Sequence, residues 1–239
     1  MMQARVQSSP EVADAAPNFD RLAGIYRWME WLSFGPYLAR CRGAFLDRMA
    51  GRQCALVIGD GDGRFTSKLM GANPDIEVDA VDASAAMLAD LVRRAGAAGA
   101  RVRTQVADAR RWRPAGNRPY DLVVTHFFLD CLTTEEVREL AAAVRPGLRP
   151  GALWVVSEFA VPDGGFGRLA AGPLVWALYR AFGVLTGLRV RRLPEYRDAL
   201  AGAGLRLGES RSFLGGLLVS EVWVANEEWI RTVAMETPP

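Results

Sequence analysis

The stretch Leu56-Val-Ile-Gly59-Asp60-Gly61-Asp62-Gly63-Arg64-Phe65 decides the fold class of this chain. An apolar run from Cys54 to Ile58 stops at a glycine cluster, and helical spacing follows to about Met70. This order is typical of a buried parallel strand that enters a helix through a tight turn. Glycines permit the turn and let a ligand approach without a Cβ in the way. The helix N-terminus beyond offers unpaired N–H groups, so the stretch predicts a nucleotide-like ligand.

The glycine spacing narrows the choice of ligand. Gly59, Gly61 and Gly63 follow the pattern G-x-G-x-G, whereas the dinucleotide fingerprint requires G-x-G-x-x-G. Starting from Gly59 or Gly61, the sixth place holds Arg64 or Thr66. The pattern therefore disfavours a nicotinamide dinucleotide, and an NAD(P)-dependent reductase is kept as the less favoured alternative.

Strands and helices alternate along the rest of the chain, and no linker or repeat divides it. Such alternation predicts an α/β fold with a doubly wound, mostly parallel sheet. Gly215-Gly216 predicts a hairpin that adds an antiparallel edge at the C-terminus. The expected strands are 54–58, 76–81, 102–106, 120–126, 151–157, 205–213 and 217–225. The expected helices are 19–32, 36–49, 63–70, 84–95, 133–145 and 194–203.

Composition excludes several classes of protein. The 239 residues are 50% hydrophobic and 23% charged, which is ordinary for a globular protein and excludes a disordered or collagen-like chain. The net charge of +2 gives no indication of a nucleic-acid partner. The three cysteines follow no metal or redox spacing, so no metal is expected. Residues 1–18 lack a secretory signal pattern, which favours the cytoplasm.

We expect a single domain over 1–239, in four parts. These are an N-terminal helical cover (1–50), a ligand-binding core (51–160), a helical lid insertion (161–193) and a C-terminal helix and hairpin (194–239). Within the lid, Arg180 is the only charged residue of 169–188. A central charge is costly in a bilayer, so a covering helix is favoured over stable membrane insertion.

Carboxylates follow the second and third expected strands. Asp82 ends the second, where a carboxylate can accept both hydroxyl hydrogens of a ribose. Asp108 ends the third, where it can accept from the amine of an adenine. The alternative for Asp108 is a turn residue that binds its own backbone.

Taken together, these motifs resemble those of class I S-adenosylmethionine-dependent methyltransferases. The resemblance covers roughly residues 52–160, and it is carried by the following pieces: the glycine loop 59–63, Val81-Asp82-Ala-Ser-Ala-Ala-Met87-Leu88, Ala107-Asp108-Ala109, Tyr120-Asp-Leu-Val-Val124 and Leu148-Arg-Pro-Gly151. The ends are similar to ubiquinone/menaquinone-type C-methyltransferases, through Phe19-Asp-Arg-Leu-Ala23 with Tyr26 and through 203–216.

The resemblance implies a seven-stranded Rossmann-like sheet and a set of residues that bind S-adenosylmethionine, with S-adenosylhomocysteine as product. Gly59 and Gly61 would face the methionine part of the cofactor, Asp82 and Ala83 the ribose, and Asp108 with Ala109 the adenine. Met87 would pack on the adenine, and Tyr26 would close over the methionine end. The acidic residue that the family usually has two places before the first glycine is Val57 here, so Asp60, Asp62 or a water would take over its contact.

Methyl transfer requires alignment of donor and acceptor, and it requires a base only if the acceptor must lose a proton. His126, the single histidine, ends the fourth strand near the ligand and is both a candidate base and a cofactor contact; the alternative is a shaping role. Glu158, after the fifth strand, is the second candidate.

The aromatic residues of the two covering segments favour a small, apolar or aromatic acceptor, methylated at oxygen or carbon. They are Tyr26, Trp28, Trp31, Trp176, Tyr179 and Phe182, and a plain core role is the alternative reading. A monomer or homodimer is expected. A binder that holds S-adenosylmethionine without transferring its methyl group is the other alternative.

Overall fold

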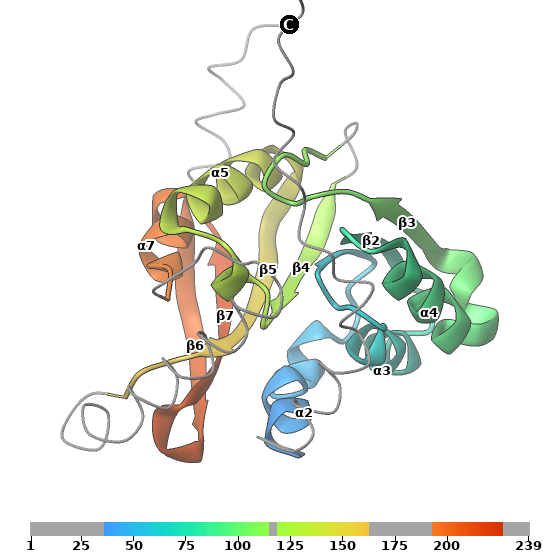
Figure 1. The fold of residues 1–239 in the computed structure, drawn as a ribbon, viewed down its shortest axis with the longest axis horizontal. Coiled ribbons are helices and arrows are strands. Elements are labelled where there is room, and N and C mark those ends of the chain that lie inside the picture. Colours follow the sequence, from blue (N-terminus) through green and yellow to red (C-terminus); the bar gives the residue numbers. More distant parts are fainter. Residues whose placement is uncertain (1–35, 115–118, 163–192, 227–239) are drawn as a thin grey trace, which may run out of the picture.

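The computed structural model describes residues 36–114, 119–162 and 193–226, and Figure 1 shows their arrangement. In these ranges seven strands form one sheet in the order β3-β2-β1-β4-β5-β7-β6. Strands β1 to β5 pair in parallel, and β7 runs antiparallel to both β5 and β6. The bounds are β1 Cys54–Ile58, β2 Glu77–Asp82, β3 Val102–Val106, β4 Tyr120–His126, β5 Leu148–Phe159, β6 Leu205–Phe213 and β7 Leu218–Ala225. The predicted mostly parallel sheet with an antiparallel C-terminal hairpin is confirmed.

Helices connect the strands where the sequence predicts them. They are α2 Pro36–Arg42, α3 Arg64–Ala72, α4 Ala85–Ala95, α5 Thr134–Val144 and α7 Tyr196–Gly202. Ser84 begins α4 by accepting the backbone N–H of Met87. Thr133 and Glu136 form the predicted capping box of α5. Short 3₁₀ segments lie at Leu46–Met49, Gly96–Arg101, Leu129–Cys131, Arg145–Gly147 and Leu214–Gly216.

Two apolar cores cover the two faces of the sheet, because successive strand residues point to opposite sides. On β1, Leu56 and Ile58 pack in the core that α5 and α7 complete. Ala55 and Val57 pack in the core completed by α3, α4 and the 3₁₀ segment at 46–49. Figure 1 shows α5 and α7 together beside β5–β7, and α3 and α4 together beside β2–β3. The sheet is therefore doubly wound.

Strands β1 and β4 lie side by side at the point where the winding of the chain reverses direction. From β1 the chain adds β2 and β3 on one side, and from β4 it adds β5 on the other. In open α/β sheets this switch point opens a crevice beyond the carboxyl ends of the strands, where ligands bind. The glycine loop after β1 and His126 at the end of β4 both lie there.

Two boundaries differ from the prediction by three residues or more, and the other described boundaries by two at most. The helix expected over 36–49 ends at Arg42, and a turn at 43–45 leads to the 3₁₀ segment. Glycine at 43 weakens a helix interior, and the break lets Phe45 and Met49 enter the core. Strand β5 begins at Leu148 instead of Gly151, because Leu148 pairs with Tyr120 and a register shift follows.

Much of the two expected covering segments lies outside the described residues, Tyr26 and residues 163–192 included. Of the N-terminal cover, Leu38 and Cys41 of α2 are buried with Phe127 and Leu218. Within the described ranges, no helix has the length and apolar character needed to cross a bilayer.

Candidate active site

Five chain segments with polar residues meet at the carboxyl edge of the parallel strands. They follow β1 (Gly59–Gly63), β2 (Asp82), β3 (Asp108), β4 (His126) and the end of β5 (Glu158). Register fixes their proximity: Asp82 is paired with Val106, and His126 with Ser157. The backbone N–H of Gly59 donates to the carbonyl of Val81 (2.9 Å), which joins the glycine loop to the end of β2.

The glycine loop has a backbone conformation that residues other than glycine rarely adopt. Gly59, Gly61 and Gly63 have φ of 73°, 61° and 76°. A Cβ on Gly59 would lie 2.2 Å from Cδ2 of Phe128, whereas a Cβ on Gly61 would meet, among the described residues, only Met87 Sδ, at 3.8 Å. Gly61 thus leaves backbone open beside Met87, as a cradle for a ligand requires.

Two carboxylates hold this loop. Oδ2 of Asp60 accepts the backbone N–H (2.8 Å) and the hydroxyl (2.7 Å) of Thr66, so it caps the first turn of α3. Burial raises the pKa of Asp60, and the hydrogen bonds from Thr66 oppose that shift. Asp62 lies 2.9 Å from Nη2 of Arg94 and 3.1 Å from Nε of Arg64. Both side chains named as substitutes for the acidic residue missing at Val57 therefore brace the loop.

Asp82 ends β2, and Met87 of α4 lies beside Gly61 of the loop. Oδ1 of Asp82 accepts the backbone N–H of Ser84 (2.9 Å), which fixes the carboxylate at the end of β2. Ala83 is exposed, and Met87 is half-buried next to Gly61.

Asp108 makes contacts within its own turn, as in the alternative to an adenine contact that the sequence left open. It accepts the backbone N–H of Arg110 (3.1 Å) and pairs with its guanidinium (Nη2 to Oδ2 2.9 Å). The hydrogen bonds and charge of Arg110 lower the pKa of Asp108 against a desolvation effect in the other direction. The next residue, Ala109, is buried. The carboxylate is thus ionised and oriented at the end of β3.

His126 is enclosed at the end of β4, with 4% of its surface exposed. Neither ring nitrogen has a hydrogen-bond partner within the described residues. Its ring meets the edge of Phe65 with the two centroids 4.4 Å apart. Burial lowers the pKa of His126 well below its usual value, and the charge of Arg42 adds to the effect. The imidazole is therefore neutral at pH 7, with one nitrogen that can accept a proton.

We expect a titration midpoint for His126 below 6.5. Because this is the chain's single histidine, ring-labelled, tag-free protein gives one imidazole NMR signal to follow with pH. Below pH 6.5 the unfolded state binds a proton that the folded state does not. The contribution of the neutral His126 to the free energy of unfolding is therefore complete above pH 6.5, and it is lost as the pH falls towards the pKa of the folded state. A midpoint at or above 6.5 would contradict the burial of this ring.

Glu158 is buried beside β4, with 1% exposure. Its Oε1 accepts the backbone N–H groups of Phe128 (3.1 Å) and Leu129 (2.8 Å). Burial first and the charge of Asp130 second raise the pKa of Glu158 well above its usual value.

Arg42 was not singled out in the sequence, yet it lies at this site. Its Cζ is 5.2 Å from the ring centroid of Phe127, and its charge acts on His126 and on Asp60. Arg42 is the last residue of α2. The periodicity of the sequence does not show how this helix packs against the strand ends. Because arginine is frequent throughout the chain, nothing in the sequence distinguishes Arg42 from the other arginines.

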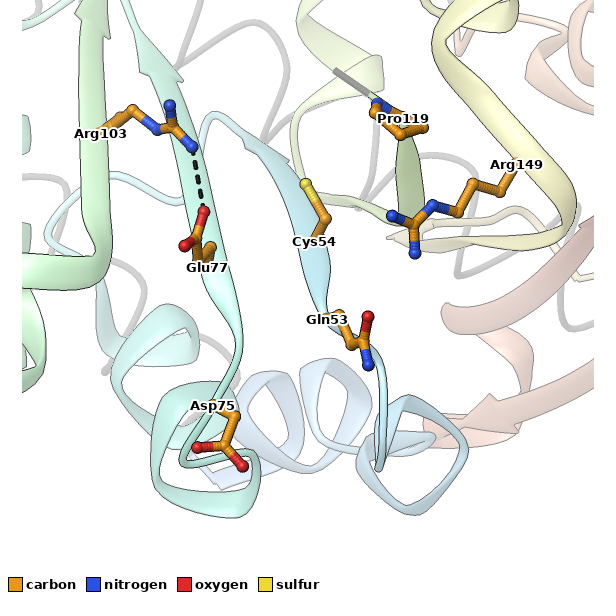
Figure 2. Close-up of a pocket in the computed structure, with 7 residues that line it drawn as sticks. All are labelled: Gln53, Cys54, Asp75, Glu77, Arg103, Pro119 and Arg149. Carbon is orange, nitrogen blue, oxygen red and sulfur yellow. Dashed lines mark hydrogen bonds and ion pairs between the residues drawn. The ribbon is translucent and has the colours of Figure 1, made fainter.

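A cavity at the opposite edge of the sheet does not contribute to this site. Its volume is about 590 Å³, and it is lined by residues at or near the amino ends of the strands, namely Gln53, Cys54, Asp75, Glu77, Arg103, Pro119 and Arg149. Figure 2 shows Arg103 paired with Glu77 along one side of it. Ligands of such sheets bind at the other edge.

Residues 55–151 match a family model described as a methyltransferase domain. This match spans the glycine loop, Asp82, Asp108 and His126. This part of the chain is a methyltransferase domain. The cofactor of such a domain is S-adenosylmethionine, and the open backbone at Gly61 and the oriented carboxylates of Asp82 and Asp108 are compatible with binding it.

Solved structures share the fold of the methyltransferase domain at low sequence identity. An O-methyltransferase family protein from Burkholderia thailandensis has a TM-score of 0.66 and 16% identity, over 87% of this chain and 61% of that one. The chain thus spans 61% of the length of that protein. The N-methyltransferase NodS from Bradyrhizobium japonicum WM9, in complex with S-adenosyl-L-homocysteine, has a TM-score of 0.58 and 17% identity, over 80% and 88%.

A third structure comes from a complex with the Trm112 methyltransferase activator of Haloferax volcanii. Its TM-score is 0.67 at 15% identity, over 90% of this chain and all of that one (100%). Among curated proteins no match to this chain is found. These comparisons show the fold of the methyltransferase domain and leave its acceptor to be inferred from the site.

Proposed function

We propose that this protein transfers the methyl group of S-adenosylmethionine to a small, apolar or aromatic acceptor, at oxygen or carbon. The observation that carries the proposal is His126, a buried, neutral imidazole at the switch point. Buried polar groups are normally hydrogen-bonded. Within the described residues, neither nitrogen of this ring has a hydrogen-bond partner. A polar group of a bound acceptor would satisfy one of them.

The residues at the strand ends would bind and align the reactants. Gly59 and Gly61 would hold the methionine part of the cofactor, and Asp82 its ribose hydroxyls. When bound, S-adenosylmethionine supplies an electrophilic methyl group. His126 would accept a proton from an acceptor hydroxyl or acidic carbon, or orient an acceptor that needs no deprotonation.

Aromatic side chains near His126 support an apolar acceptor. Phe127 and Phe159 pack with centroids 5.1 Å apart, and Phe65 touches His126 itself. Rings around a strand-end site exclude water and favour flat or apolar ligands. We propose that residues 161–193 complete the cover over the acceptor, in a cytoplasmic monomer or homodimer without a nucleic-acid partner.

A methyl-transfer screen tests this proposal. Purified protein is incubated with methyl-labelled S-adenosylmethionine and a panel of phenols, quinols and other apolar acceptors, with nucleic acids and peptides in separate arms. Label in the phenol or quinol arm is the expected result. Label in only the nucleic-acid or peptide arm would overturn the proposed acceptor class.

Asp82→Ala is expected to weaken binding of S-adenosylhomocysteine by about 1.5–3 kcal/mol, because hydrogen bonds to a charged group are lost. Calorimetric titration measures the change. Asp79→Ala is the matched control on the same strand: its carboxylate bonds the hydroxyl of Tyr120 (2.9 Å), so its loss should spare affinity. Equal affinities of the Asp82 variant and the wild type would remove Asp82 from the ribose site.

A binder that does not transfer methyl groups is the second candidate function. Val57, in the place of the family's usual acidic residue, is 1% exposed and packs in the core with α3 and α4. The site therefore lacks a carboxylate there for the cofactor's ammonium group. Tight S-adenosylmethionine binding with no methylated product from any acceptor would favour this function. The NAD(P)-dependent reductase is less favoured, since residues 55–151 match a methyltransferase domain.

A further inference from the structure

The turn that follows β4 holds a disfavoured backbone. Phe127 has a φ of 53°, in the left-handed region that residues with a bulky side chain rarely enter. Its backbone N–H donates to the carbonyl of Ser157 at 2.6 Å. Such a conformation persists only where surrounding contacts enforce it, and it is frequent at functional sites.

Glu158 supplies contacts that hold the turn after β4 in this conformation. Its Oε1 accepts the backbone N–H groups of Phe128 and Leu129, the two residues that follow the strained position. These bonds span β4 and β5, and they satisfy two donors that the turn would otherwise leave unpaired. Oε2 is buried and has no hydrogen-bond partner within the described residues.

The turn places two side chains against the cofactor loop. The ring of Phe128 lies directly over Gly59, where a Cβ would come 2.2 Å from Cδ2. His126 immediately precedes the turn and contacts Phe65 near the start of α3. A change in the path of residues 127–129 would therefore move the aromatic ring at the glycine loop and the imidazole together.

We propose that Glu158 is a positioning residue of the methyl-transfer site: its buried Oε1 fixes the 127–129 turn and thereby the places of His126 and Phe128. This inference rests on the proposed function, and it assigns Glu158 no proton transfer with the acceptor. The raised pKa of Glu158 agrees with it, because an acceptor oxygen is present in both the neutral and the ionised carboxyl.

Substitution by glutamine separates positioning from base catalysis. Glu158→Gln keeps a carbonyl oxygen for both backbone donors but cannot take up a proton. We expect it to retain kcat to within about threefold with an unaltered pH profile. Glu158→Ala removes the acceptor, and we expect kcat to fall by about tenfold or more as the bonds to the turn are lost. If the glutamine variant is as inactive as the alanine variant, the proposal is wrong and Glu158 acts through its proton.

Amide hydrogen exchange at Phe128 and Leu129 gives a readout independent of turnover. Protection in the wild type and in Glu158→Gln, and its loss in Glu158→Ala, is the expected result. Equal protection in all three proteins would overturn the proposal. Because no acceptor is needed, this arm decides the role of Glu158 even if the protein proves to transfer no methyl group.

Glu221→Gln is the matched control. Glu221 is a fully buried carboxylate on the neighbouring β7, and its Oε2 is bonded by the Tyr196 hydroxyl and Trp223 Nε1. The substitution Glu221→Gln replaces a carboxyl that is as buried as that of Glu158 but does not touch the 127–129 turn. We expect unchanged exchange at residues 128 and 129, and altered exchange there would show a general effect of removing buried charge.

Discussion

Replacing His126 with glutamine should lower the rate of methyl transfer by about 10²–10⁴-fold, the usual contribution of a general base. Glutamine keeps a polar side chain at the end of β4 but cannot accept a proton from the acceptor. Affinity for S-adenosylhomocysteine should stay within about threefold, because the ribose and adenine contacts that we propose come from the ends of β2 and β3 and do not involve His126. Single-turnover rates with saturating methyl donor measure the effect.

The pH dependence of the same reaction provides the second half of this test. With a lowered pKa, the wild-type imidazole is already neutral at pH 7, so the rate should be flat there and fall as the pH drops below the folded pKa. The glutamine variant should lack that fall. Full activity of the variant would leave His126 a shaping residue with no proton to transfer.

Gly63→Ala should lower the free energy of unfolding by about 2–5 kcal/mol. A left-handed backbone costs a residue with a Cβ about 1–2 kcal/mol, and overpacking a core costs about 1–3 kcal/mol more. Gly63 has a φ of 76°, and its Cβ would lie 2.5 Å from Cγ and 2.7 Å from Cα of Leu91. The latter is backbone of α4 and cannot move aside. Urea denaturation measures the loss.

Gly71→Ala is the control for this substitution. It lies in α3, the helix that Gly63 caps, and among the described residues a Cβ there would meet nothing within 4 Å. Alanine in a helix is favoured over glycine by about 0.5–1 kcal/mol, so this variant should be as stable as the wild type or slightly more so. Equal stability of the two variants would show that the close packing of the loop on α4 is not formed.

The order of the elements was predictable because it depends on local patterns. Apolar runs that stop at glycines or carboxylates identified the parallel strands, and the caps at Ser84 and Thr133 identified helix starts. The placement of Asp82, Asp108 and His126 at one edge followed from the same reasoning, since parallel strands end together. Their contacts to ligand and acceptor stay predictions, as does the similarity to ubiquinone/menaquinone-type enzymes.

The side-chain environment of the site was not predictable. That Arg42 acts on His126 depends on how α2 packs across the strand ends, and helical periodicity does not specify that packing. The position of Phe128 over Gly59 depends on the left-handed Phe127, which no propensity favours. Glu158 was identified by its place after β5, but its bonds to the turn arise from the register between β4 and β5. These are contacts between residues about 30 to 85 positions apart.

Calorimetric titration with S-adenosylhomocysteine tests the central claim most directly, because cofactor binding underlies every role assigned to the strand ends. NADH and NADPH are titrated in parallel. We predict binding of S-adenosylhomocysteine at about micromolar Kd, roughly −8 kcal/mol, with no heat from either nicotinamide. Binding of a nicotinamide with no heat from S-adenosylhomocysteine would contradict the account.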